Sequence, residues 1–351
     1  MTSRHETNRR VLRRLWWCGT AAALLGSGAA CTPTVNIHVG DSDDGPLVAR
    51  QVLEDQGADA TVAMIDVRGL IADVRMPGLF GSSPSPVDQL VARLDQAARD
   101  KNVKAVILRI NSPGGTVTGS DIMFREVRRF AETTRKPVVA SLGEVAASGG
   151  YYLACSSDAI VAQPTSITGS IGVIIPTINF SEGLNRIGIK SRDVVSGPNK
   201  NLASPFEPIR EGQYAVLQGV VDEFYARFKG VVTSRRPKLD LNAHPEAVDG
   251  RVMTGSRAVE LGLADREGGV REAFETAKQM AGVTAARLVK YSSPDGRPRT
   301  PYAATDGAVP EGNSSGDHEL NLVQIRMDAL SLPGLASGSS GVYYLWTPTL
   351  E

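Results

Sequence analysis

The stretch SLGEVAASGGYYLAC, Ser141–Cys155, places a serine between a predicted strand and a predicted helix. The apolar run Val138–Leu142 predicts a short buried strand. Tyr151–Cys155 predicts a buried helix, and the small residues between the two elements allow another backbone to approach closely. Ser148, at this turn, is a candidate nucleophile, because the free N–H groups at a helix start can stabilise an anion. A helix cap is the alternative role, and serine fills it well.

A second loop has the composition of an oxyanion hole. The apolar run Ala105–Ile110 predicts a strand, and NSPGG follows it at Asn111–Gly115. Proline fixes a turn and glycine permits unusual dihedral angles, so the N–H groups of this loop can converge on an anion. Two further motifs come after Ser148. They are TGSIGV at Thr168–Val173 and SGPNKN at Ser196–Asn201.

The four motifs INSPGG, ASGGYYLA, TGSIGV and SGPNKN, in this order and spacing, resemble those of the signal peptide peptidase A family. Members of this family are membrane-anchored serine–lysine peptidases. The resemblance runs from about residue 61 to about residue 282. It implies an α/β protein with a Clp/crotonase-like layered fold of repeated ββα units. It also implies a serine endopeptidase that cuts apolar, extended segments such as cleaved signal peptides.

The resemblance implies roles for five residues. Ser148 matches the nucleophile, Lys200 the general base, and Ser170 the serine that hydrogen-bonds the lysine amine. Gly115 matches the oxyanion position, and the N–H of Gly149 is the natural second donor. Taken without the resemblance, the lysine is a solvated turn residue and Ser170 forms part of a turn. The two glycines then serve only close packing.

Composition argues against several other classes of protein. Thirty-eight basic and 38 acidic residues give a net charge of zero, which does not support a nucleic-acid partner. None of the four histidines falls between Asn111 and Lys200, so a Ser-His-Asp triad would have to use His244. The histidines also lack metal-ligand spacing, and Gly114-Gly115 lacks the GK[ST] of a phosphate loop. We therefore expect no cofactor, no metal and no nucleic-acid partner.

The N-terminal residues predict export. Residues 1–14 are basic, Leu15–Ala30 is apolar, and Cys31 follows small residues, as in a bacterial lipoprotein signal. Lipidation of Cys31 is the leading interpretation; cleavage near Ala30 and retention as a short signal anchor are the alternatives. All three predict a bacterial cell-envelope protein, anchored in the membrane with its catalytic domain outside the cytoplasm.

Composition and periodicity divide the chain into four parts. We expect an export signal and anchor over 1–31, a tether over 32–59 with one helix near 48–56, a peptidase domain over 60–284, and a linker with an apolar tail over 285–351. Within the peptidase domain the patterns predict strands at 61–67, 159–162 and 190–195. They predict helices at 87–99, from Ser120, and at 211–229, 257–263 and 270–280.

Two apolar segments predict self-association. The loop around Leu79-Phe80 and the tail Gly341–Trp346 are too apolar to be simply solvated, so we expect the tail to be docked. Docking of the tail on a second copy would give a homo-oligomeric ring. Cys155 is expected to be a buried structural thiol.

Three rival functions remain open on the sequence. An acyl-CoA enzyme of the crotonase type shares the oxyanion loop, but it needs no Ser148–Lys200 pair, and an export signal argues against it. A related peptidase of the same fold could cut a membrane partner protein. A catalytically inactive crotonase-fold scaffold is the third. Labelling of Ser148 by an active-site serine probe would exclude the first and the third.

Overall fold

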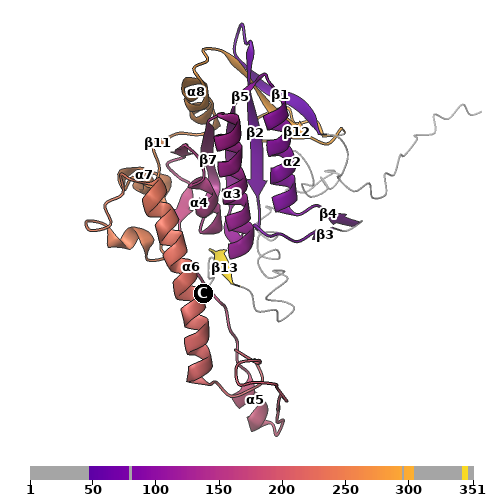
Figure 1. The fold of residues 1–351 in the computed structure, drawn as a ribbon, viewed down its shortest axis with the longest axis vertical. Coiled ribbons are helices and arrows are strands. Elements are labelled where there is room, and N and C mark those ends of the chain that lie inside the picture. Colours follow the sequence, from indigo (N-terminus) through magenta and orange to yellow (C-terminus); the bar gives the residue numbers. More distant parts are fainter. Residues whose placement is uncertain (1–46, 79–80, 295, 304–341, 347–351) are drawn as a thin grey trace, which may run out of the picture. The chain divides into compact units, whose positions relative to one another are not determined.

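The structure is a computed structural model that describes residues 47–78, 81–294, 296–303 and 342–346. A nine-stranded sheet lies at its centre (Figure 1). Its main path runs, in spatial order, through β1 (Val48–Glu54), β12 (Ala286–Ser292), β2 (Ala60–Arg68), β5 (Val103–Ser112), β7 (Val138–Ala147), β8 (Ala159–Ala162) and β11 (Arg266–Glu267). Beyond this path, β9 (Ile167–Gly169) pairs with the end of β7, and β10 (Val252–Thr254) pairs with β9.

The central strands are parallel and buried on both faces. β12, β2, β5, β7 and β8 run parallel to one another, whereas β1 is antiparallel to β12. Alternate side chains of β5 enter two different cores: Val106 and Leu108 join one cluster, and Ala105 and Ile107 join the other. This explains why β5 reads as an almost continuous apolar run.

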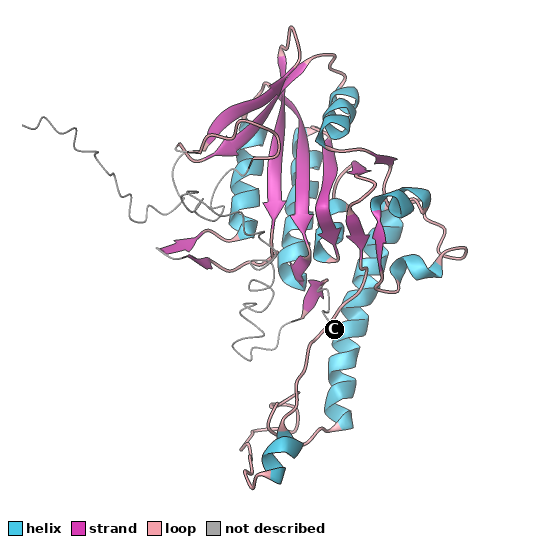
Figure 2. Ribbon diagram, turned by 180° about the vertical axis from the view of Figure 1, so that it is seen from behind, coloured by secondary structure: helices cyan, strands magenta, loops and turns pink. Residues whose placement is uncertain are grey.

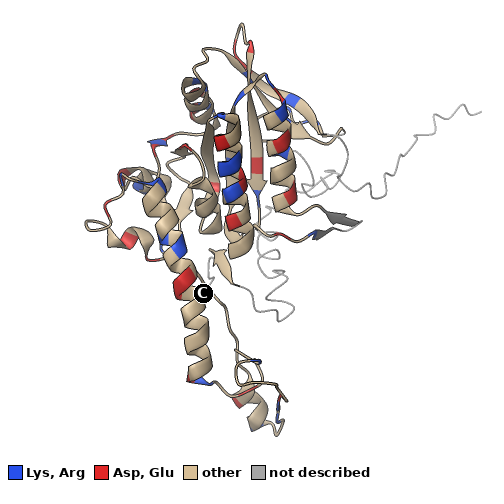
Figure 3. Ribbon diagram, viewed as in Figure 1, with Lys and Arg blue, Asp and Glu red and all other residues tan. Residues whose placement is uncertain are grey.

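Helices cover both faces of the sheet. α2 (Pro86–Arg99) and α3 (Val117–Thr134) belong to the larger core, and α8 (Val270–Ala281) packs its apolar side against the other face (Figure 2). Charged residues lie along α2 and α3, while the strands between them carry few (Figure 3). The α/β layered fold is therefore confirmed.

Of the remaining described elements, only α6 is long. They are β3 (Met76–Gly78), β4 (Gly81–Ser83), β6 (Gly114–Thr116), α4 (Gly149–Ala154), α5 (Ser181–Arg186), α6 (Glu211–Arg235), the 3-10 helix η1 (Pro245–Val248), α7 (Gly255–Glu260) and β13 (Tyr343–Leu345). The structure confirms the helices expected at 87–99, 211–229 and 270–280 and the strands expected at 61–67 and 159–162.

Three local predictions are wrong. Residues 48–54 form strand β1 instead of a helix, because their exposed and half-buried residues largely alternate along an edge strand paired with β12. Residues 190–195 form no strand. The helix α3 begins after Thr116 and not at Ser120, because the Thr116 hydroxyl caps it by accepting from the Gly119 amide. The Ser120 hydroxyl instead donates to the Thr116 carbonyl within the first turn. The sheet thus includes residues on both sides of 60–284.

The apolar segment at 342–346 is docked, but it is docked on its own chain and not on a second copy as the ring hypothesis had it. β13 pairs antiparallel with β6, and the Tyr344 side chain is fully buried. Cys31 and the other residues of 1–46, Leu79-Phe80, and residues 304–341 lie outside the described residues. Of the helices that the structure describes, none has the length and apolar character needed to cross a bilayer.

Candidate active site

Ser148 occupies a strained turn between β7 and α4. Its φ of 52° and ψ of −115° lie in a region that non-glycine residues rarely adopt. Its amide donates to the Gly169 carbonyl at 2.8 Å, and its carbonyl accepts from Tyr152 as α4 begins. Such strain costs about 1–3 kcal/mol and persists where the surroundings enforce it, commonly at active sites.

The Ser148 hydroxyl is buried and has no hydrogen-bond partner among the described residues. It does not cap α4, since the first turn of that helix has no side-chain cap. A buried hydroxyl without a partner is unfavourable by about 1–3 kcal/mol. The helix-cap reading of Ser148 is therefore wrong, and the geometry leaves the hydroxyl available for chemistry.

The glycine loop lies directly against the start of α4. A Cβ on Gly115 would come within 1.9 Å of the Ile71 carbonyl oxygen, and one on Gly149 within 2.4 Å of the Ser120 hydroxyl. A Cβ on Gly114 would lie 2.7 Å from the Gly149 amide nitrogen. These close approaches require glycine at all three positions. They place Gly149 against Gly114, the neighbour of Gly115 in the glycine loop.

Ser170 lies next to Ser148 through the backbone. Ser170 follows Gly169, whose carbonyl accepts a hydrogen bond from the Ser148 amide. The amide of Ser170 donates to the backbone carbonyl of Arg251 at 2.7 Å. Its φ is also 52°, and its side chain is buried. The structure therefore places Ser148 and Ser170 on two turns joined by one backbone hydrogen bond, and it places the Gly114-Gly115 loop against Gly149.

Lys200 is not part of this group within one chain. It is exposed, on a loop held to the start of α6, where Gln213 donates to the carbonyl of Pro198. Further along α6, Phe228 packs against Tyr152, one helical turn after Ser148. Fifteen residues separate Gln213 from Phe228, which is about 22 Å along a helix. No hydrogen bond or ion pair between described residues joins Lys200 to Ser148 or Ser170.

An aromatic cluster lies next to the site, and the sequence patterns did not predict it. The Tyr152 ring lies 5.3 Å from Phe124 and 5.0 Å from Phe228, measured between ring centroids. Its hydroxyl donates to Asp121 at 2.9 Å, and Arg227 also binds Asp121. Burial and the neighbouring carboxylate raise the pKa of Tyr152 well above its usual value, so the phenol stays neutral. The pair Tyr151-Tyr152 after Ser-Gly-Gly was the available signal.

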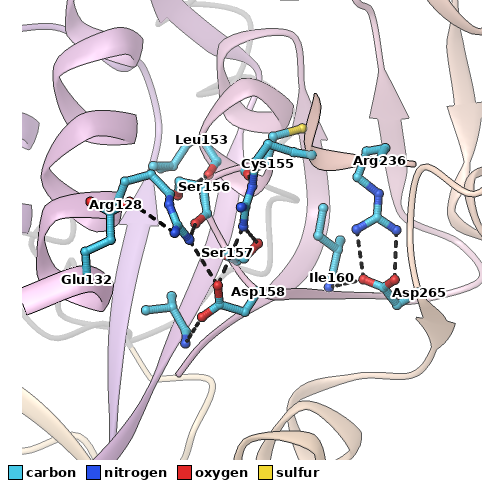
Figure 4. Close-up of polar contacts among 12 residues, drawn as sticks. Arg128, Glu132, Leu153, Cys155, Ser156, Ser157, Asp158, Ile160, Arg236 and Asp265 are labelled. Carbon is cyan, nitrogen blue, oxygen red and sulfur yellow. Dashed lines mark hydrogen bonds and ion pairs between the residues drawn. The ribbon is translucent and has the colours of Figure 1, made fainter. Parts of the chain in front are cut away.

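Arginine side chains hold the end of α4 (Figure 4). Arg235 donates to the carbonyls of Cys155 and Ser157 at 3.0 and 2.9 Å, and Arg128 donates to the Ser156 carbonyl at 3.2 Å. Cations suit the last carbonyls of a helix, which lack partners within it. A six-residue helix that carries the site is thus fixed at its far end.

Two further groups lie near the end of α4. Arg236 forms a two-point ion pair with Asp265 at 2.9 and 3.0 Å (Figure 4). Cys155 is buried, and burial raises the pKa of its thiol to about 12, so it remains protonated at neutral pH. This confirms the expectation of a buried structural thiol.

Comparison with known proteins gives one consistent assignment. The profile of peptidase family S49 matches residues 131–284. An Enterococcus faecium protein named as a signal peptide peptidase, SppA, is 33% identical over 246 residues, which cover 70% of this chain and 71% of that protein. A Synechocystis protein named as a protease is 34% identical, covering 63% of this chain and 75% of its own length.

A longer relative shares the same region. The chloroplastic serine protease SPPA of Arabidopsis thaliana is 34% identical over 242 residues, 68% of this chain, but this chain spans only 35% of it. The match therefore covers about a third of that protein. Together with the strained serine and the glycine loop, these relationships show that the chain belongs to peptidase family S49 and is a serine endopeptidase.

Proposed function

We propose that the chain hydrolyses peptide bonds in apolar, extended segments such as cleaved signal peptides, with Ser148 as nucleophile and Lys200 as general base. The observation that carries the proposal is the buried Ser148 hydroxyl, which has no partner among the described residues and lies at the start of α4, where the glycine loop packs against that helix. The name of the Enterococcus relative suggests the substrate class.

The reaction follows from this geometry. The Ser148 oxygen attacks the carbonyl carbon of the scissile bond as its proton passes to the base. The oxygen of the tetrahedral intermediate becomes negative, and the amides of Gly115 and Gly149 stabilise it. The bond to nitrogen then breaks, the amine leaves with the proton, and water hydrolyses the acyl-serine ester.

A second copy of the chain supplies Lys200 in this proposal. Lys200 is exposed and lies at the far end of α6 from Tyr152. The segment around it exposes an unusual number of large apolar side chains, including Ile178, Phe180, Ile187, Ile189, Val194, Phe206 and Ile209. Patches of this kind mark interaction surfaces. Contact with a neighbouring copy would bury this segment and exclude water from the lysine amine.

Complementation tests the composite site. Ser148→Ala and Lys200→Ala chains are each expected to be inactive, whereas a co-assembled equal mixture regains up to about a quarter of wild-type activity, because some sites combine an intact serine with an intact lysine. A serine-reactive fluorophosphonate that labels wild-type Ser148 provides the control for folding. An inactive mixture of chains that do co-assemble would refute a base supplied by a second copy.

The N-terminal signal supports a location at the membrane. In this proposal Cys31 is lipidated and the peptidase domain lies outside the cytoplasm, near the apolar segments that it cuts. The membrane and a homo-oligomeric partner thus both belong to the proposal.

A further inference from the structure

The first turn of α6 holds the loop that carries Lys200. The side chain of Gln213 is buried there and donates to the Pro198 carbonyl and, at 3.2 Å, to the side-chain oxygen of Asn201. Pro198 and Asn201 lie on either side of Lys200 in the chain. The position of Lys200 therefore follows the position of this end of α6.

The opposite end of α6 is held by the rest of the peptidase domain. No residue of α6 between Gln213 and Phe228 is fully buried, whereas Phe228 and Val232 are. Arg227 stands next to Phe228 and pairs with Asp121 of α3. Among the described residues, this is the ion pair from α6 to another helix that lies nearest the Lys200 end. It therefore marks the place where α6 leaves the core.

The carboxylate of Asp121 joins α6 to α4. Arg227 donates to one oxygen of Asp121 through Nε at 3.1 Å and Nη2 at 2.6 Å, and the Tyr152 hydroxyl donates to the same oxygen at 2.9 Å. The Tyr152 amide in turn donates to the Ser148 carbonyl at 2.8 Å. A continuous series of contacts thus leads from Ser148 to the residue at which α6 leaves the core.

The pair between Arg227 and Asp121 is better placed than an ordinary surface pair. The Asp121 side chain is only 14% exposed, although that of Arg227 is 46% exposed. Hydrogen bonds between charged groups are stronger than neutral ones, and a partly buried pair is less screened by salt. The ring of Tyr152 also packs against Phe228, so the same two helices meet through an apolar contact and a polar one.

The length of α6 amplifies small changes at this joint. Fourteen residues separate Gln213 from Arg227. They span about 21 Å of helix, so a tilt of about 5° at Arg227 moves the Gln213 end by about 2 Å. A displacement of about 1 Å of a catalytic group can cost about 100-fold in rate. The direction of α6 is therefore critical for a base that it carries.

We infer that Arg227 and Asp121 are positioning residues that set the direction of α6 and thereby deliver Lys200 to the Ser148 of a neighbouring copy. This inference rests on the proposed function, in which a second copy supplies the lysine. The ion pair lies beside the serine of its own chain, yet its effect on the reaction is exerted at the serine of the neighbour. A lost pair should thus impair a chain as lysine donor and spare it as serine donor.

Mixed assemblies test this difference. The reference is the co-assembled equal mixture of Ser148→Ala and Lys200→Ala chains. Arg227→Gln added to the Ser148→Ala chain alters the lysine donor and should lower kcat at least about tenfold with little change in KM, because the base is misplaced while substrate binding is intact. Arg227→Gln added to the Lys200→Ala chain alters the serine donor and should leave the reference rate. That chain keeps the bond from Tyr152 to Asp121.

Two further variants of the lysine donor provide controls. Arg125 binds the other oxygen of Asp121 at 2.7 Å, but it lies on the same helix, α3, one turn away. Arg125→Gln should therefore keep the reference rate, since it does not change the contact with α6. Arg227→Lys keeps a cation at this position and should recover part of the rate that Arg227→Gln loses.

The outcomes separate this inference from the proposed function. An active mixture with Arg227→Gln in the serine donor shows that such chains fold and assemble. Equal losses in both arrangements, or a loss in the serine donor alone, would mean that the pair acts on its own serine and would overturn the inference. Reference rates in both arrangements would overturn it as well, with the composite site left in place. An inactive reference mixture of co-assembled chains would refute the composite site and this inference with it.

Discussion

The amide of Ser148 donates a 2.8 Å hydrogen bond to the carbonyl of Gly169, which ties the proposed nucleophile to the residue just before Ser170. Ser148 and Ser170 both have a φ of 52°. One backbone bond therefore couples two strained turns from different parts of the chain. A substitution that shifts the backbone of one turn should therefore shift the backbone of the other.

Ser170→Ala is expected to slow peptide hydrolysis by about 10- to 100-fold without abolishing it. In our proposal Ser170 orients the lysine amine, and misplaced catalytic groups cost rates of this size. Ser148→Ala should remove all measurable activity under the same conditions. A Ser170→Ala chain with unchanged kcat would show that this serine has only a structural part.

Gly115→Ala is expected to reduce kcat/KM at least about 100-fold, because the added methyl group collides with the Ile71 backbone and displaces an oxyanion donor. Gly230→Ala is the matched control. Its Cβ meets nothing within 4 Å on exposed α6, so the variant should be slightly more stable, by up to about 1 kcal/mol. Comparable losses of activity in both variants would contradict the role of Gly115.

Lys200→Arg is expected to be inactive although it keeps the positive charge, because a guanidinium group does not release its proton. His244→Gln should keep activity, since the mechanism uses no histidine. The rates of both variants with a chromogenic peptide decide the point. Near-normal hydrolysis by Lys200→Arg would mean that another group is the base.

Asp265→Asn is expected to reduce the free energy of unfolding by about 1–3 kcal/mol at pH 7, since it leaves buried Arg236 without its carboxylate partner. Burial of Asp265 opposes its ionisation, but the hydrogen bonds from Arg236 and the Ile160 amide lower its pKa below the ordinary value. A lowered pKa stabilises the fold above the unfolded-state value and loses this effect as pH falls through the folded-state value.

The pH dependence of the free energy of unfolding tests the role of the Arg236–Asp265 pair. Urea unfolding of the wild type from pH 6 down to pH 3 should show a steeper loss of stability than Asp265→Asn, which lacks this titrating group. Asp249→Asn alters an exposed pair with Arg251 and should have a smaller effect at pH 7. Parallel curves for wild type and Asp265→Asn would contradict the assignment.

Cys31→Ser is expected to abolish lipid attachment and to release the chain from membranes in cell fractionation. The basic start, the short apolar run and the cysteine motivate this expectation. Mass spectrometry of the purified N-terminal peptide is the direct measurement. An intact N-terminus with an unmodified Cys31 would rule lipidation out.

The sequence predicted those parts of the candidate site that consist of turns between residues close together in the chain. Ser148, Gly115 and Gly149 come together because two strand-to-loop turns at neighbouring strands, β5 and β7, end on the same edge of the sheet. Such turns depend on nearby residues, so glycine and proline positions reveal them. The helix wrongly expected at 48–56 shows the limit of this approach, because edge-strand pairing with β12 depends on residues more than 200 positions away.

The aromatic cluster of Phe124, Tyr152, Phe228 and Tyr344 could not be predicted from spacing. Its side chains come from α3, α4, α6 and β13, and no periodic pattern links these elements. The apolar tail did predict that something must cover it, but not that β6 would be the partner. Likewise, the SGPNKN motif predicts a role for Lys200 but gives no information on whether the lysine would act in its own chain or in a second copy.

The strand β13 belongs to the same polypeptide as β6, the strand with which it pairs beside Ser148. A tethered ligand has an effective concentration that dilution does not change. The supply of Lys200 by a second copy, in contrast, depends on how densely the chains are crowded. The pairing of β13 and the proposed completion of the site by Lys200 thus respond differently to density, so in our proposal crowding of the chains raises the turnover of each chain.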